Sequence, residues 1–368
     1  MPPTASTSVD TPSHNGQPAA RHAPAALVHY ADALLVRAGV RSDIAHATAG
    51  VLVEGDLLGH TTHGLALLPA YLGELARGTM SQAGEPSVLH ARPAAQTWDG
   101  QRLPGPWTTM KAVDTAVTMA ETQGTGTVVI RRSHHIACLA AYLKRATDRG
   151  FALLLLCSDP SVCSVAPFGA VTPVFTPNPL AAGFPTSGDP VLLDISASLT
   201  TNGLTNRLHK AGEKLPHAWL QDAEGRATDD PAVLFAEPKG TLLPLGGQDA
   251  GHKGFALALL VEALTAGLAG FGRADPAAGW GATVFVQALD PMAFGGREAF
   301  VRQMDWLVDA CHAARPVPGT RGARMPGERG LALAREQVRS GVELHPTILP
   351  ALAEWGARYG VPPPPALA

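Results

Sequence analysis

Two segments that contain histidine are the parts of this chain best suited to chemistry. Residues 59–64 read Gly-His-Thr-Thr-His-Gly, and residues 131–135 read Arg-Arg-Ser-His-His. Histidine exchanges protons close to neutral pH because its unperturbed pKa is about 6.5. Each segment is small or polar and lies between apolar stretches, as expected of turns that border a buried core. Together they predict an active site that transfers protons.

Composition limits the classes of protein to which the chain can belong. The chain has 368 residues, 46% hydrophobic and 16% charged, which is typical of a compact soluble enzyme with room for two domains. The net charge of -3 and the lack of any lysine or arginine run exclude nucleic acid as a partner, because phosphate binding needs clustered cations. The longest apolar stretch, residues 255–271, is interrupted by Glu262 and is too short to span a membrane. It predicts a buried helix and no membrane partner.

The cysteines and the N-terminal residues indicate the compartment. The four cysteines form no Cys-x-x-Cys pair, which excludes a zinc ribbon and predicts free, buried thiols in a reducing compartment, the cytoplasm. They are Cys138, Cys157, Cys163 and Cys311. Residues 1–22 are rich in Pro, Ser, Thr, Ala and Gly and contain no apolar signal segment, so they predict a flexible tail.

The middle of the chain has the pattern of an α/β domain. Short apolar runs of strand length occur at residues 128–130, 153–156 and 191–193. Residues 138–149 have helical spacing and end at Gly150, a typical helix cap. These elements predict a central sheet that is covered on both faces.

Both ends of the chain are helical in character. Residues 25–58 predict helices broken at Gly39 and Gly55, and a further helix runs from Pro69 to about Gly78. Three C-terminal segments, 297–314, 330–341 and the residues after Pro346, are also helical. We expect the two ends, residues 23–80 and 300–368, to form one helical domain into which an α/β domain, residues 81–299, is inserted.

The glycine-rich segments of the chain do not match the common nucleotide-binding patterns. Gly124-Thr125-Gly126 precedes a strand and lacks a third glycine, so an ordinary Rossmann site is excluded. Residues 246–254 lack the Gly-Lys-Ser/Thr ending of a phosphate loop. Their glycines would nevertheless expose backbone N–H groups at the start of the helix from Phe255, where Lys253 would attract phosphate. An exposed lysine in an ordinary loop explains the segment equally well.

Six motifs together resemble the malate/L-lactate dehydrogenase family of nicotinamide-dependent oxidoreductases, whose fold is not the Rossmann fold. They occur in the family's order over roughly residues 25–350. The motifs are residues 59–64 with Leu68-Pro69-Ala70-Tyr71, residues 131–142, residues 178–185, Leu193-Asp194-Ile195-Ser196 with Ser198, residues 252–255, and Met325-Pro326-Gly327-Glu328.

The resemblance implies a two-domain subunit with an inserted α/β domain, a helical domain from both chain ends, and a non-Rossmann cofactor site. It also implies a homodimer whose interface helps to build the active site. NAD or NADP would be the cofactor, bound by Pro190, Asp194, Ser196, His252, Lys253, Gly327 and Glu328. The Asp194 carboxylate suits ribose hydroxyl groups, which favours NAD. Alternatively, Asp194 only caps the turn that follows it.

The resemblance also implies the reaction. Reduction of C=O or C=N needs a hydride on carbon and a proton on the heteroatom, and His135 matches the family histidine that handles this proton. His63 is the second candidate for proton transfer, and Tyr71 is expected on the pocket wall beside them. The predicted function is hydride transfer between NAD(P) and a small molecule, namely a 2-oxo or 2-hydroxy acid, a ketone or a cyclic imine.

The chain departs from the family pattern at three places. Leu67 stands where the family generally carries an arginine that clamps a substrate carboxylate, and leucine supplies no hydrogen bond. This predicts a bulkier or less charged substrate, unless another cation such as Arg77 or Arg132 replaces the arginine. His134 stands where asparagine is common, and its ring either faces the pocket or the surface. Pro177, before Asn178, removes one backbone donor.

Two other functions fit part of the pattern. Asp56, His60 and His63 have the spacing of metal ligands, which His134 and His135 would complete in a metal-dependent hydrolase. No His-Glu-x-x-His motif supports this, and we expect no metal. The other alternative is a family relative that binds cofactor but has lost turnover together with the arginine.

Overall fold

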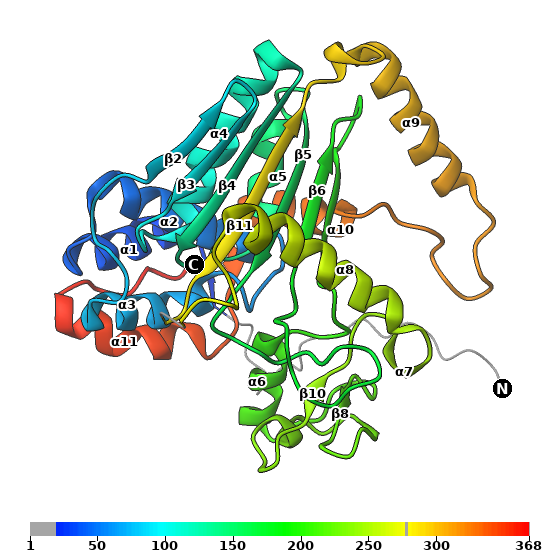
Figure 1. The fold of residues 1–368 in the computed structure, drawn as a ribbon. Coiled ribbons are helices and arrows are strands. Elements are labelled where there is room, and N and C mark those ends of the chain that lie inside the picture. Colours follow the sequence, from blue (N-terminus) through cyan, green and yellow to red (C-terminus); the bar gives the residue numbers. More distant parts are fainter. Residues whose placement is uncertain (1–19, 277–278, 368) are drawn as a thin grey trace.

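The computed structural model describes residues 20–276 and 279–367 (Figure 1). Most of the predicted flexible tail, residues 1–19, lies outside the described residues. The predicted boundary at residue 22 is wrong, because Arg21–His22 form strand β1, which pairs antiparallel with β12, Val342–Glu343.

A seven-stranded mixed sheet forms the centre of the molecule, with the strand order β2-β3-β4-β11-β5-β6-β7 (Figure 1). Only β3 and β4 are parallel neighbours in this sheet. The strands are β2 (Ser87–Arg92), β3 (Ala95–Asp99), β4 (Thr125–Ser133), β5 (Ala152–Ser158), β6 (Leu180–Phe184), β7 (Val191–Ile195) and β11 (Ala282–Leu289). The three strands predicted from apolar runs lie in β4, β5 and β7, and the α/β fold class is confirmed.

Helices cover both faces of the central strands. On one face, α4 (Gly105–Gln123) and α5 (Ala140–Thr147) enclose the largest apolar core. On the other, α8 (His252–Glu262) and the π-helical segment η3 (Ala263–Gly267) cover a smaller cluster around Phe285. The predicted buried helix at residues 255–271 is therefore two elements. It buries only one side, since Leu259 and Leu260 remain about half exposed.

The chain ends meet beside the sheet. The first helices are α1 (Pro24–Arg37), α2 (Ser42–Leu57) and α3 (Leu68–Arg77), and the last are α9 (Arg297–Ala313), α10 (Glu328–Ser340) and α11 (Ile348–Tyr359). α11 packs on α1 and α3, and α10 packs on α2, whereas α9 stands apart from the body (Figure 1). The division into domains stays a prediction.

The predicted helix break at Gly39 is present, but the break at Gly55 is wrong, because Gly55 lies inside α2. A Cβ atom on Gly55 would lie 2.9 Å from the carbonyl oxygen of His63. The missing side chain lets the turn at residues 59–64 fold back against α2. The glycine therefore serves close packing at the candidate site and does not end the helix.

A second, smaller core lies at one end of the molecule and was not predicted. Residues 202–242, here called the small lobe, contain α6 (Asn202–Ala211) and the three-stranded sheet β10-β8-β9. The strands are β8 (Leu220–Gln221), β9 (Ala227–Thr228) and β10 (Thr241–Leu242). Their apolar cluster includes Leu215, Leu220 and Leu242 and packs against Phe175 from outside the lobe.

None of the described helices is both long and apolar enough to cross a membrane. All four cysteines are free thiols. Cys138 and Cys157 are buried as predicted, but Cys163 is exposed and Cys311 is half-buried, so the prediction of burial is wrong for these two.

Candidate active site

The structure brings the two histidine segments together. His63 comes from the turn between α2 and the short 3-10 helix η1 (Leu65–Leu67), and His135 follows the end of β4. Their rings are stacked, with centroids 6.0 Å apart and an angle of 26° between the planes. The loop that carries His135 is held in an unusual conformation, because Arg132 and Ala137 both have positive φ angles, 49° and 60°.

Tyr71 from α3 anchors the His135 ring. Its hydroxyl oxygen lies 2.9 Å from Nδ1 of His135 and donates to the His135 carbonyl oxygen at 3.1 Å. The backbone N–H of Ala137 donates to the same Nδ1 at 3.2 Å. Since an amide can only donate, Nδ1 is the acceptor and the neutral ring carries its proton on Nε2. Nε2 of His135 has no hydrogen-bond partner among residues 20–276 and 279–367.

Both stacked histidines are neutral at pH 7. Burial, followed by the charges of His63 and His134, holds the pKa of His135 well below its usual range. Burial, followed by the charges of His60 and Arg207, lowers the pKa of His63 to about 4. Nδ1 of His63 lies 2.9 Å from the Thr62 hydroxyl oxygen. The two rings therefore present neutral imidazoles side by side.

His134 is fully buried, which answers the open question about its direction. Burial lowers its pKa to about 4, although Glu74, whose Oε2 lies 3.5 Å from Nε2, acts in the opposite sense. Trp280 was not predicted as a site residue. Its ring centroid lies 4.8 Å from that of His135 and 5.0 Å from that of His134. Tyr71, His134 and Trp280 thus form an aromatic wall behind His135.

Asp56 shapes the histidine turn. Its Oδ2 accepts the backbone N–H of Leu65 at 2.7 Å, and burial raises its pKa to about 7. The cluster of potential metal ligands in the described part of the chain is a different one. In it, ligand atoms of His60, Cys138 and Asp194 lie within 4.8 Å of one another. The predicted grouping of Asp56, His60 and His63 around a metal does not form.

Asp194, on β7, joins the predicted cofactor segment to the histidine turn. Its Oδ2 accepts the Ala140 N–H at 2.8 Å at the start of α5, and the Cys138 thiol lies 3.7 Å away. Burial raises the pKa of Asp194, and the charge of His60 opposes this shift. Asp194 therefore caps the start of α5, which precedes it in the chain, and not the following turn that the alternative named.

The remaining residues predicted to bind the cofactor lie in two separate parts of the structure. In the first, the Leu192 N–H donates to the Pro326 carbonyl at 3.0 Å, which brings the segment that follows Pro190 next to Gly327. Glu328 turns back on its own loop, where its Oε2 accepts the Met325 N–H at 2.9 Å. The hydroxyl of Ser196 donates to the carbonyl of Ser198 at 2.9 Å.

His252 and Lys253 lie in the second place, exposed at the start of α8. A short helix, α7 (Gly247–Ala250), precedes them, and the Gly254 N–H donates to the Leu245 carbonyl at 3.0 Å. We predicted free backbone N–H groups at the start of the helix from Phe255. This prediction is wrong for Gly254, whose N–H group is hydrogen-bonded. The His252 ring contacts Phe168, which lines an open hollow of about 770 Å³.

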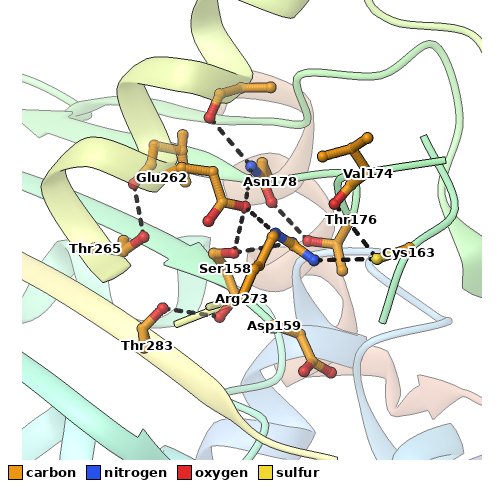
Figure 2. Close-up of polar contacts among 12 residues, drawn as sticks. Ser158, Asp159, Cys163, Val174, Thr176, Asn178, Glu262, Thr265, Arg273 and Thr283 are labelled. Carbon is orange, nitrogen blue, oxygen red and sulfur yellow. Dashed lines mark hydrogen bonds and ion pairs between the residues drawn. The ribbon is translucent and has the colours of Figure 1, made fainter. Parts of the chain in front are cut away.

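The Asn-Pro motif has a structural role (Figure 2). Asn178 is fully buried, and its Nδ2 donates to Glu262 Oε1 at 2.9 Å. The same oxygen accepts from Ser158 Oγ and from Arg273 Nε, each at 2.8 Å. Glu262, the charge that interrupts the longest apolar stretch, therefore ties the Asn178 loop to α8 and β5.

Both cations predicted as replacements for the family arginine are engaged in ion pairs. Leu67 packs, partly buried, against the main core. Arg77 pairs with Glu74, and Arg132 pairs with Asp99 at 2.8 Å. The cation that does reach the histidine turn is Arg207 of the small lobe, which the sequence reading missed.

Comparisons with known proteins agree with this geometry. The family model for malate/L-lactate dehydrogenase matches residues 23–353. The chain belongs to the malate/L-lactate dehydrogenase family. It is 32% identical over 321 residues to the (2R)-3-sulfolactate dehydrogenase (NADP(+)) of Chromohalobacter salexigens, covering 84% of this chain and 90% of that protein. It is 30% identical over 335 residues to the Delta(1)-pyrroline-2-carboxylate reductase of Ancylobacter novellus, covering 88% and 94%.

A solved structure shows the same fold. Malate dehydrogenase from Pyrococcus horikoshii OT3 superposes with a TM-score of 0.84 at 24% identity, over 93% of this chain and 96% of that chain. Membership in the malate/L-lactate dehydrogenase family makes this chain an oxidoreductase for CH–OH or C=N groups of small molecules, and it supports a nicotinamide cofactor. The resemblance drawn from the six motifs is confirmed. A metal-dependent hydrolase does not agree with this membership.

Proposed function

We propose that this protein transfers hydride between NAD(P) and a 2-oxo or 2-hydroxy acid, a ketone or a cyclic imine, with His135 as general acid and base. The observation that carries the proposal is the stacked pair of His63 and His135, since Nε2 of His135 has no hydrogen-bond partner in the part of the chain that the structure describes. The names of two relatives, a sulfolactate dehydrogenase and a pyrroline-2-carboxylate reductase, fit C–O and C–N chemistry respectively.

The contacts of His135 define its part in the reaction. In the neutral ring, Nε2–H donates to the substrate oxygen or nitrogen and stabilises the negative charge that develops there. Complete proton transfer to that atom needs the imidazolium form, which carries a second proton on Nδ1. The Tyr71 hydroxyl, 2.9 Å from Nδ1, can then accept that proton's hydrogen bond. Tyr71 thus stabilises the charged ring against its buried surroundings.

The cofactor supplies or takes up the hydride when it is bound. The residues fit a dinucleotide, because the exposed Lys253 at the start of α8 can neutralise phosphate and its neighbour His252 contacts Phe168, which lines the hollow. Pro190, Asp194, Ser196, His252, Gly327 and Glu328 are the other residues proposed to hold it. Asp194 favours NAD, since a carboxylate accepts from ribose hydroxyl groups and repels a 2′-phosphate.

We propose an atypical substrate pocket. Leu67 places an apolar side chain where an arginine would clamp a carboxylate, and it packs against the main core. Trp280 and Tyr71 add aromatic surface close to His135. The pocket therefore has an apolar wall where a malate or lactate pocket would have an arginine. Any substrate carboxylate must be bound from another direction.

A homodimer is the proposed assembly. No residue of α9 is buried, and its Trp306 is 65% exposed. Phe294, just before this helix, is 70% exposed. Apolar side chains of this size rarely stay in contact with water in a monomer. Light scattering of the wild type and of Trp306→Glu tests this, because the wild type should be a dimer and the variant a monomer. We place the enzyme in the cytoplasm, where its free thiols stay reduced.

The experiment that tests the function follows oxidation of NADH and of NADPH by absorbance. The panel contains 2-oxo acids, uncharged ketones and cyclic imines, each with and without chelator. Turnover of a panel member with either cofactor, unaffected by chelator, is the expected result. Binding of reduced cofactor without any turnover would support the alternative of a relative that has lost activity. If neither cofactor binds, the proposal is wrong.

A further inference from the structure

Arg207 is a cation without an ionic partner beside the histidine turn. Its Nη1 donates to the Thr61 hydroxyl at 2.9 Å, and its Nη2 donates to the Thr61 carbonyl at 2.6 Å. The side chain is half-buried. Among residues 20–276 and 279–367, no carboxylate oxygen lies within 4.0 Å of the Arg207 guanidinium. Two contacts to Thr61 leave most of its five N–H donors available.

A glycine on α6, Gly203, allows this helix to lie close to the histidine turn. Gly203 and Arg207 are four residues apart and share a face of α6. A Cβ atom on Gly203 would lie 3.3 Å from Thr62 Cβ and 3.7 Å from His63 Cε1. The glycine therefore keeps α6 close to His63, and Arg207 reaches Thr61 one turn further along.

The charge of Arg207 contributes to the pKa shifts of groups at and near the candidate site. It lowers the pKa of His63 and also that of His345, while burial lowers the pKa of Arg207 itself. The charge of Asp56 opposes the lowering of the Arg207 pKa and so stabilises the charged guanidinium. Burial, however, raises the pKa of Asp56 itself to about 7. At neutral pH this carboxyl is only partly ionised, so Arg207 is poorly compensated. A half-buried guanidinium that is poorly compensated favours the binding of an anion.

We propose that Arg207 binds a carboxylate on the carbon that reacts, so that the substrates are 2-oxo acids, 2-hydroxy acids or cyclic imines with a 2-carboxylate. This inference rests on the proposed function. It supplies from α6 of the small lobe the cation that the resemblance would place at Leu67. The carboxylate takes two hydrogen bonds from the planar guanidinium, while the adjacent oxygen or nitrogen lies against His135.

The test compares charged and uncharged substrates in matched variants. Arg207→Gln removes the cation, and Lys210→Gln removes an exposed cation on the same helix. We expect Arg207→Gln to lower kcat/KM for pyruvate by about 10- to 100-fold, because a charge-assisted hydrogen bond is lost. It should leave kcat/KM for methyl pyruvate, the uncharged ester of the same 2-oxo acid, within about 3-fold. Lys210→Gln should change neither, and Arg207→Lys should restore part of the pyruvate activity.

A structural role for Arg207 makes a different prediction. Thr61→Val removes the hydroxyl that Arg207 binds but keeps the charge, so it should leave the preference for pyruvate over methyl pyruvate intact. Equal losses for both substrates in Arg207→Gln, or equal effects of Thr61→Val and Arg207→Gln, would overturn the inference.

Binding separates failure of this inference from failure of the proposed function. Calorimetry with oxamate, an unreactive 2-oxo acid analogue, is run on the wild type, Arg207→Gln and Lys210→Gln in the presence of NADH. Loss of oxamate binding in Arg207→Gln alone supports the carboxylate site even if no substrate of the panel is turned over. Equal oxamate affinity in all three proteins overturns the carboxylate site, even where NADH is oxidised normally.

Discussion

The histidine site and the small lobe are built in opposite ways. Tyr71 and His134 are fully buried in or beside the largest core, which the sheet and α1 to α5 enclose. In α6, by contrast, Thr205 is the sole buried residue of the helix. The apolar cluster of the lobe is also much smaller than the main core. The proton-transfer groups are therefore surrounded by a densely packed core, whereas the proposed carboxylate site lies on a lobe with a small core.

This contrast separates two kinds of effect. Catalytic geometry must hold within about half an ångström, which dense packing around His135 provides. A substrate site on a thinly packed lobe can change its contacts while the catalytic groups stay in place. Changes near Tyr71 and His135 should therefore alter kcat, and changes at Arg207 should mainly alter KM and specificity.

The largest expected effect comes from the catalytic base itself. His135→Asn keeps a polar side chain of similar size but removes the titratable imidazole, and kcat should fall by about 10²- to 10⁴-fold. Affinity for NADH, measured by fluorescence titration, should stay within about 2-fold. Undiminished turnover would remove His135 from the mechanism, while loss of NADH binding would show that the substitution has disturbed the fold.

Tyr71→Phe tests the anchor of the ring. The variant keeps the aromatic packing against Trp280 and loses the hydroxyl 2.9 Å from Nδ1. Without this acceptor the imidazolium is less stable, so the already low pKa of His135 should fall further. Reduction needs the protonated ring and should slow about 10-fold at pH 7, with a smaller effect on oxidation. Rates in both directions across pH check this, and equal losses at every pH would point to mispacking.

Leu67→Arg sharpens the comparison between the two sides of the pocket. In the Arg207→Gln background, the new guanidinium should restore part of kcat/KM for pyruvate, by about 3- to 10-fold, since it binds the carboxylate from the α3 side. In the wild type the gain should be smaller, because Arg207 already binds it. Equal gains in both backgrounds would mean that the two arginines act independently and do not share one carboxylate.

The smallest expected effect is on stability. Asp56 loses its proton at about pH 7 when folded but near its ordinary pKa of 3.8 when unfolded. Between these values the unfolded state binds fewer protons, so the free energy of unfolding falls as pH rises from about 4 to about 7. Asp56→Asn keeps an acceptor for the Leu65 N–H and removes this fall, so its Tm at pH 8 should exceed that of the wild type by about 2 °C or more. Parallel Tm curves from pH 5 to 8 would contradict the buried-acid interpretation.

Local patterns made part of this structure predictable. The strands at residues 128–130, 153–156 and 191–193 are continuous apolar runs. The first two lie in the inner strands β4 and β5 of the main sheet, and the third lies in its edge strand β7. Helix ends were predicted well where a glycine adopts a positive φ angle, as at Gly78. Gly55 misled the prediction because close packing against the His63 carbonyl required it inside a helix.

Long-range contacts explain what the sequence could not supply. The strands of the small lobe are two residues long, too short for a periodic pattern. Arg207 meets Thr61 across 146 residues of sequence, so no local motif marks it. Trp280 and Glu74 likewise reach His134 only through the tertiary fold. The turn with His63 and the segment with His135 were identified because short motifs carry them, but their stacking is a property of the folded chain.

Transfer of label from the cofactor tests the central claim most directly. The enzyme is mixed with NADH or NADPH deuterated at C4 of the nicotinamide and with pyruvate or a cyclic imine carboxylate, and the product is analysed by mass spectrometry and NMR. We predict one deuterium on the former carbonyl or imine carbon of the product, delivered from a single face of the nicotinamide. A reduced product without deuterium from either face, or no oxidation of either cofactor, would contradict the assignment of this site as a nicotinamide-dependent oxidoreductase.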